Sequence, residues 1–205
     1  MTLSINKDGE LIVKSPKNCE NKIAAIIAKK SLWIKEAKKR MHTKKGVIYT
    51  LDNDTTIYFL GEGYPVDFEK SEKNSLRFIM QKGFKYSYKN DLDKAKFLEI
   101  LDSFYLQKAQ ELLPKKIKEH AESMGLHPTK ISFKKTKSQW GSCSKANALS
   151  INTGVMKLPW HLIEYIIIHE LAHIKHKNHQ KPFWALVAQY APNVQELRRE
   201  MKAYA

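Results

Sequence analysis

Cysteine is scarce in this chain of 205 residues, which contains only Cys19 and Cys143. Two cysteines so far apart cannot form a disulfide framework or a multi-cysteine metal site. The longest apolar runs, residues 23–28 and 158–168, are too short or too interrupted to cross a bilayer. The first ten residues lack the apolar segment of a secretory signal. We therefore expect a cytoplasmic protein that has no membrane partner.

Glycine and proline are also infrequent, with eight and seven residues. The chain is therefore neither collagen-like nor of low complexity. Its apolar fraction of 42% is enough for a packed core. A chain of this length favours one domain, or one domain with an appendage.

Arginine is the scarce cation in a strongly basic chain. Lysine and arginine together number 36 against 21 acidic residues, a formal net charge of +15. Such an excess is typical of proteins that meet nucleic acids or phosphorylated substrates. Recognition of base edges favours the fork of arginine, however, and most of the excess here is lysine. We interpret it as a solvated surface that makes at most a weak nucleic-acid contact. The arginines are Arg40, Arg77, Arg198 and Arg199.

Residues 1–90 are predicted to form a β-rich N-terminal region with one helix. Short β-prone runs alternate there with turn residues such as Asp8-Gly9 and Lys82-Gly83. The predicted strands cover residues 3–5, 11–13, 47–50, 55–60, 76–80 and 84–88. Apolar residues at helical spacing predict the helix over residues 20–41.

Residues 91–205 are predicted to be mainly helical and to continue the same structural unit. Apolar spacing predicts a helix over 93–113, a second one started by Pro114 and stopped by Gly125, and a third over 158–175. A last helical stretch over 180–201 is interrupted at Pro192. Strands are expected over 130–134 and 148–152, around a loop at 139–144.

The stretch that carries chemistry lies in the third of these helices. It reads His169-Glu170-Leu171-Ala172-His173-Ile174-Lys175-His176-Lys177-Asn178-His179. Histidines four apart on a helix project from one face, so both can reach one zinc ion. Glu170 beside them can take a proton from water activated by the metal. Five of the eight histidines fall between residues 161 and 179. Such clustering is typical of a metal site.

A catalytic zinc site usually takes a third protein ligand, and three candidates compete for that position. His179 can turn back to the metal only if the helix ends first, and residues 175–178 form a plausible end with Asn178 as a left-handed cap. His176 shares the face of His169 and His173 only if the helix continues. Glu196 or Glu200, from the following helix, would instead complete a site of two histidines and a glutamate.

These motifs resemble the YgjP-like metal-dependent hydrolases, predicted zincin metallopeptidases akin to the SprT-like proteins. The resemblance is carried by the HExxH stretch, by Asn178-His179, by Phe183-Trp184 and by residues 139–144, Gln-Trp-Gly-Ser-Cys-Ser. It implies an α+β fold, a compact zincin-like domain in which a small mixed or antiparallel sheet packs on the active-site helix. It also implies one zinc ion held by His169, His173 and His179, with Glu170 as the base.

Around this site the patterns are less specific. Residues 148–152 form either the edge strand along which zincins lay an extended substrate or an ordinary core strand. We expect the tryptophans at 140, 160 and 184 to pack in the core, and Cys143 to be structural. The residue that stabilises the oxyanion is not identified by the pattern. The candidates are Tyr165, His161 and Tyr190.

The sequence thus predicts a zinc-dependent hydrolase, most readily a metallopeptidase acting on a peptide or protein. One alternative is a metal-dependent nucleoside triphosphate hydrolase in which lysines hold the phosphates, because a fold does not fix a function. The other is a basic nucleic-acid-associated protein with an auxiliary zinc site.

Overall fold

The computed structural model describes residues 2–5, 11–14, 20–31, 34, 49–52, 54–202 and 204. The chain divides into two compact units, one of residues 1–49 with 202–205 and one of residues 50–201. In the first, β1 (Thr2–Ile5) pairs antiparallel with β2 (Leu11–Lys14), which confirms the predicted hairpin strands. Helix α1 (Glu20–Lys29) follows, and most of the helix predicted beyond Ser31 lies outside the described residues.

A four-stranded sheet opens the second unit, with the order β3-β4-β6-β5. Its strands are β3 (Thr56–Phe59), β4 (Glu62–Lys70), β5 (Ser75–Ile79) and β6 (Gly83–Tyr88). The predicted strands at 55–60, 76–80 and 84–88 are confirmed. Of the strand predicted at 47–50, Tyr49 and Thr50 lie outside any strand, and residues 47–48 are not described.

Strand β4 was not predicted, and it contains Pro65, a residue that is unusual in the middle of a strand. The pairing explains why proline is tolerated there. The first half of β4 pairs antiparallel with β3, and the second half pairs parallel with β6. Pro65 lies at the change of partner, where β4 leaves one neighbour and joins the other.

Helix α3 runs without interruption over Lys94–Met124, so the prediction that Pro114 starts a separate helix is wrong. A proline inside a helix removes one backbone hydrogen bond, but burial of an apolar face on both sides of it outweighs that loss. The buried face includes Phe97, Leu101, Tyr105, Ala109, Leu113, Ile117 and Ala121. As predicted, the helix stops at Gly125, whose φ of 63° is left-handed.

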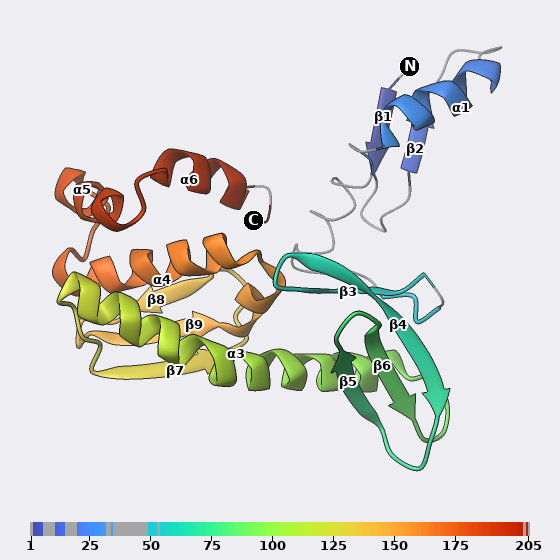
Figure 1. The fold of residues 1–205 in the computed structure, drawn as a ribbon, viewed down its shortest axis with the longest axis horizontal. Helices are drawn as coiled ribbons and strands as arrows, with labels where there is room; N and C mark the ends of the chain where they lie inside the picture. The colour runs from blue at the N-terminus through green and yellow to red at the C-terminus, as the bar shows by residue number, and fades with distance from the viewer. Residues whose placement is uncertain are drawn as a thin grey trace. The chain divides into compact units, whose positions relative to one another are not determined.

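A three-stranded sheet lies beside the C-terminal half of α3, as Figure 1 shows. Its strands are β7 (Lys130–Lys134), β8 (Gly141–Cys143) and β9 (Ala148–Asn152), in the order β7-β9-β8. Strand β9 is parallel to β7 and antiparallel to β8. The loop predicted at 139–144 therefore contains a strand. Of the two interpretations of residues 148–152, the core strand is confirmed and the edge strand is wrong, because β9 is central and the edges are β7 and β8.

Helix α4 packs against β8, β9 and α3 (Figure 1). The 3₁₀-helix η1 (Thr153–Lys157) precedes α4 (Trp160–Lys175), which is followed by α5 (Lys181–Tyr190) and α6 (Val194–Lys202). The third predicted helix and the interruption at Pro192 are thus confirmed. Leu162, Ile163, Ile167 and Leu171 of α4 are fully buried. The fold is α+β, with a small mixed sheet packed on the helix that carries the HExxH stretch.

Among the described helices, none combines the length and apolar character needed to span a membrane. The boundary between a strand-rich region ending at residue 90 and a helical region starting at residue 91 stays a prediction.

Candidate metal centre

His169, Glu170 and His173 all lie in the last turns of α4. The rings of His169 and His173 stand 5.0 Å apart between centroids, as residues four apart on one helical face should. Both histidines are half-buried, whereas Glu170 is only 6% exposed. Three polar side chains therefore lie close together in largely apolar surroundings.

Helix α4 ends at Lys175, within the predicted range, but not in the predicted way. The left-handed residues other than glycine in the described ranges are Leu51, Leu60, Gln81 and Asn147, so the left-handed cap predicted at Asn178 is wrong. The chain instead leaves the helix through an extended backbone at His176, with φ −125° and ψ 102°. The backbone N–H of His176 still donates to the Ala172 carbonyl at 2.9 Å.

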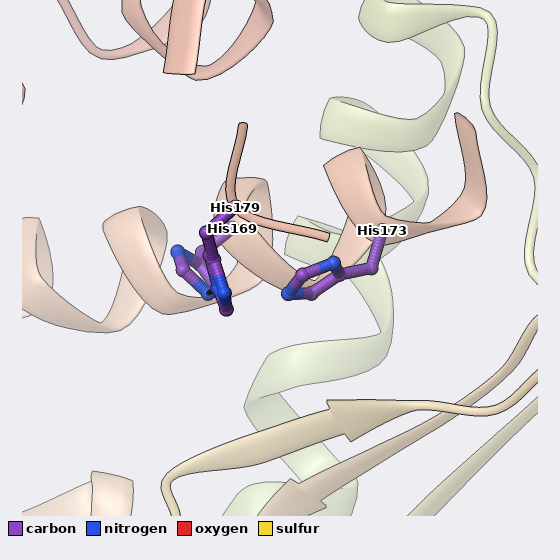
Figure 2. Close-up of side chains that lie close together, drawn as sticks. All are labelled: His169, His173 and His179. Atoms are coloured by element: carbon purple, nitrogen blue, oxygen red, sulfur yellow. Dashed lines mark hydrogen bonds between the residues drawn. The ribbon is translucent and has the colours of Figure 1, made fainter. Parts of the chain in front are cut away.

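This exit from the helix returns His179 to the histidines of α4. Its Nε2 atom lies 2.9 Å from Nε2 of His169, and its ring centroid lies 4.7 Å from that of His173. One ligand atom from each of the three residues can be chosen so that all lie within 4.8 Å of one another. Figure 2 shows the two histidines of α4 and the loop histidine directed toward one another.

The other candidates for a third ligand lie elsewhere. The backbone carbonyl of His176 accepts a hydrogen bond from Nδ1 of His173, and the His176 side chain is not in the cluster. Glu200 contacts Nε2 of His161 at 2.9 Å, and both side chains are exposed. Glu196 is exposed and is likewise outside the cluster.

Burial favours the neutral form of the histidines, which is the form that binds metals. It lowers the pKa of His169 to about 3, helped by the positive charges that His173, His179 and Arg198 can carry. Burial also lowers the pKa of His173. Both rings are therefore neutral at pH 7 and keep a lone pair for a metal ion.

The two histidines of α4 are oriented by different means. Nδ1 of His173 donates to the His176 carbonyl at 2.9 Å, which leaves its Nε2 lone pair free toward the cluster. Nδ1 of His169 is buried without a hydrogen-bond partner among the described residues. The ring of His169 is held by packing instead, with the Phe183 ring 4.9 Å away.

Glu170 lies on the same helix, and the pKa of its carboxyl group is raised to about 7 by burial. A carboxyl group of this kind can accept and release a proton near neutral pH, which is what a general base needs. Among the neighbours of Glu170 is the edge strand β8, whose Gly141 approaches its side chain closely.

An aromatic layer from α5 covers the histidines. Trp184 stacks on the His179 ring at 5.5 Å with an interplanar angle of 26°, and Arg198 of α6 lies 4.1 Å above the Trp184 ring. The three tryptophans expected to pack in the core, at residues 140, 160 and 184, are all half-buried, and Trp184 packs on the histidines of the site. Trp184 follows His179 by five residues in the sequence, and this proximity was the signal from which its contact with the histidine could have been predicted.

The candidates for oxyanion stabilisation lie at different places. Tyr165 is buried one turn before His169, with ring centroids 6.0 Å apart, and burial raises its pKa. His161 is engaged by Glu200. Tyr190 is half-buried at the end of α5.

Lys177, which the sequence analysis did not single out, connects the loop of His179 to the β8–β9 turn. Its Nζ atom donates to Asn147 Oδ1 at 2.6 Å and to the Ser144 carbonyl at 3.0 Å. The left-handed Asn147, with φ 59°, shapes this turn. The position of the loop is thus fixed by the sheet as well as by α4.

The three imidazoles fit a divalent metal such as zinc. Neutral imidazole nitrogens are good ligands for zinc, and three protein ligands are the usual number in catalytic zinc sites. Two Nε2 atoms bound to one tetrahedral zinc ion would lie about 3.3 Å apart. The 2.9 Å between His169 and His179 is close to that spacing.

Comparison with known proteins identifies the kind of domain. A family model described as YgjP-like, metallopeptidase domain, matches residues 1–204. No curated protein matches the chain. The solved metallopeptidase zymogen of Methanocaldococcus jannaschii jannalysin is 27% identical over 43% of this chain and 91% of its own, with a TM-score of 0.39. That of Pyrococcus abyssi abylysin is 24% identical over 44% and 91%, with a TM-score of 0.41.

Proposed function

The chain belongs to the YgjP-like metallopeptidase family, and we propose that it is a zinc-dependent peptidase in which Glu170 is the general base. In this proposal His169, His173 and His179 hold one zinc ion, and the substrate is a peptide or protein. Family membership makes the chain a metal-dependent hydrolase. The choice of metal and the roles of the four residues are the proposed part.

The convergence of the three imidazoles supports the proposal most strongly. Two of them are brought together by helical spacing, but the third returns only because α4 ends at Lys175. In the metal-free protein the 2.9 Å contact between the two Nε2 atoms is an imidazole–imidazole hydrogen bond. A shared metal ion would be bound by the lone pairs of both nitrogens.

The proposed roles of the zinc ion and of Glu170 follow from their chemistry. Bound zinc supplies Lewis acidity, which activates water at neutral pH and polarises the scissile carbonyl. Glu170, next to His169 in the chain, takes a proton from the attacking water and passes it to the leaving amine. Burial raises the pKa of this carboxyl group to about 7 in the metal-free protein, and the same burial favours the protonated form in which Glu170 would hold the proton between the two transfers.

A cysteine mechanism is disfavoured by the surroundings of Cys143. Burial raises the pKa of its thiol, although the ammonium group of Lys177 lies 3.8 Å from Sγ and acts in the opposite direction. The thiol therefore stays protonated at neutral pH, and a protonated thiol is a poor nucleophile.

The proposal is tested by assaying the purified protein on a panel of peptides and on a panel of nucleoside triphosphates. We expect peptide cleavage that is lost on chelation and restored by zinc, and no nucleotide hydrolysis. Glu170→Gln should retain zinc and lose turnover. Glu164→Gln is the matched control, since Glu164 is on the same helix and pairs with Lys116 instead of facing the histidines. Full activity of Glu170→Gln, or hydrolysis of nucleotides alone, would contradict the proposal.

A further inference from the structure

We propose that Gly141, on the edge strand β8, is a positioning residue for the carboxylate of Glu170. The absence of a side chain at Gly141 leaves the space that the Glu170 side chain occupies. This inference rests on the proposed role of Glu170 as general base. It gives a function to the motif at residues 139–144, which the metal ligands leave unexplained.

Gly141 and Glu170 approach each other more closely than they could if residue 141 carried a side chain. A Cβ atom built on Gly141 would lie 2.6 Å from Cγ, 2.8 Å from Cδ and 2.8 Å from Oε1 of Glu170. Real Cβ atoms essentially never make contacts shorter than 3.0 Å. All three atoms belong to the end of the side chain that carries the reacting oxygens. An alanine at this position must therefore displace the carboxyl group itself.

Glu170 has little room to move aside. The residue is only 6% exposed, so protein atoms already occupy most of the space around it. Close-packed surroundings transmit a displacement instead of absorbing it. The carboxyl group is thus confined between its own helix and the backbone of β8.

Strand β8 is also fixed, because Asn152 anchors the chain just before Gly141. The buried Asn152 side chain donates to the carbonyls of Gln139 at 2.9 Å and Thr136 at 3.1 Å, and its backbone N–H donates to the Trp140 carbonyl at 2.8 Å. Gly141 itself is paired with Ile151 in the sheet. The strand cannot retreat from α4 without breaking these bonds.

The backbone of Gly141 gives no other reason for a glycine. The glycines with a left-handed φ in the described residues are Gly61, Gly83 and Gly125, so the conformation of Gly141 is one that alanine can adopt. The requirement for glycine therefore comes from Glu170. A displacement of about 1 Å at a reacting group can cost about 100-fold in rate.

Gly141→Ala is the direct test, with Gly63→Ala as the matched control. Gly63 also lies in a strand without a left-handed φ, and a Cβ there would meet Thr56 Cγ2 at 3.0 Å and Tyr58 Cε1 at 3.1 Å and no atom of Glu170. We expect Gly141→Ala to lower kcat by about 100-fold while KM and zinc affinity stay near their wild-type values. Gly63→Ala should keep its kcat within a few-fold. An unchanged kcat in zinc-loaded Gly141→Ala would overturn the inference.

A stability cycle keeps the inference testable even if Gly141→Ala folds poorly. Glu170→Ala removes the three atoms that the new Cβ would meet. We expect Gly141→Ala to lower the urea midpoint of the otherwise wild-type protein and to leave that of Glu170→Ala unchanged. Equal losses in both backgrounds would refute the positioning role. Because this readout does not use activity, its failure is distinguishable from failure of the proposed function, which is tested by the activity of Glu170→Gln and by the substrate panel.

Discussion

The Nε2 atoms of His169 and His179 lie 2.9 Å apart, although the two residues are ten positions apart in the chain. In the metal-free protein one of the two atoms must carry a proton, because two bare lone pairs at that distance repel. A metal ion between them replaces that proton and draws on both lone pairs. The relationship depends on the end of α4 at Lys175, on the contacts of Lys177 and on the Trp184 ring stacked on His179.

Removal of the third imidazole should weaken metal binding strongly. We expect His179→Ala to lower zinc affinity by more than about 100-fold, since even outer partners of metal ligands contribute about 10- to 100-fold. Titration against a zinc chelator measures this loss. His176→Ala is the control, because His176 acts through its backbone carbonyl, which the substitution retains. Equal losses in the two variants would contradict the assignment of His179.

Lys177 should act on the metal through the position of the His179 loop. Lys177→Met removes the bonds to Asn147 and to the Ser144 carbonyl, so we expect zinc affinity to fall by about 10-fold. The same chelator titration applies. Lys175→Met, in the last turn of α4, removes an exposed lysine and should leave the affinity unchanged. Wild-type affinity in Lys177→Met would show that the loop needs no anchor on the sheet.

The buried carboxyl group of Glu170 should make the metal-free protein less stable at high pH. Its pKa is about 7 in the folded protein and 4.5 ordinarily, so the folded state holds this proton more tightly than the unfolded state. The stability linked to that proton is complete below pH 4.5 and is lost as the pH rises through 7.

Glu170→Gln isolates this effect, because glutamine does not titrate and the histidines contribute equally to both proteins. From pH 5 to pH 8, we expect the unfolding free energy of the wild type to fall by about 2 kcal/mol more than that of Glu170→Gln. Urea unfolding of the metal-free proteins at the two pH values measures the difference. A constant difference would show that Glu170 is not desolvated.

Pro114 should cost stability where it stands in α3. The residue is exposed and lies inside a continuous helix, so Pro114→Ala restores a backbone donor without disturbing the core. Proline is about 3 kcal/mol less favourable than alanine in a helix interior. The greater freedom of the unfolded chain with alanine offsets up to about 1 kcal/mol. We expect a net gain of about 1–2 kcal/mol in urea unfolding, and a loss would mean that the proline ring itself packs.

Features encoded by neighbouring residues could be predicted from the sequence. The spacing of His169 and His173 is a local property of any helix, and so are the apolar face of α3 and its stop at Gly125. Strands β5 and β6 were visible because a turn separates two β-prone runs.

The features that escaped prediction depend on residues far apart in the chain. Strand β8 has the weakly β-prone sequence Gly-Ser-Cys and exists because β9 offers it a partner. Pro114 is accommodated because burial on both sides of it holds the helix together. The contact of Gly141 with Glu170 joins residues 29 positions apart, and no periodicity in the sequence records it.

X-ray absorption at the zinc edge of the metal-loaded protein tests the central claim most directly. One zinc ion per chain should show three nitrogen ligands at about 2.0–2.1 Å and a light-atom ligand from water. His179→Ala should lose one of the nitrogen ligands. A sulfur ligand at about 2.3 Å, or a zinc environment in which the loss of His179 changes nothing, would contradict the account.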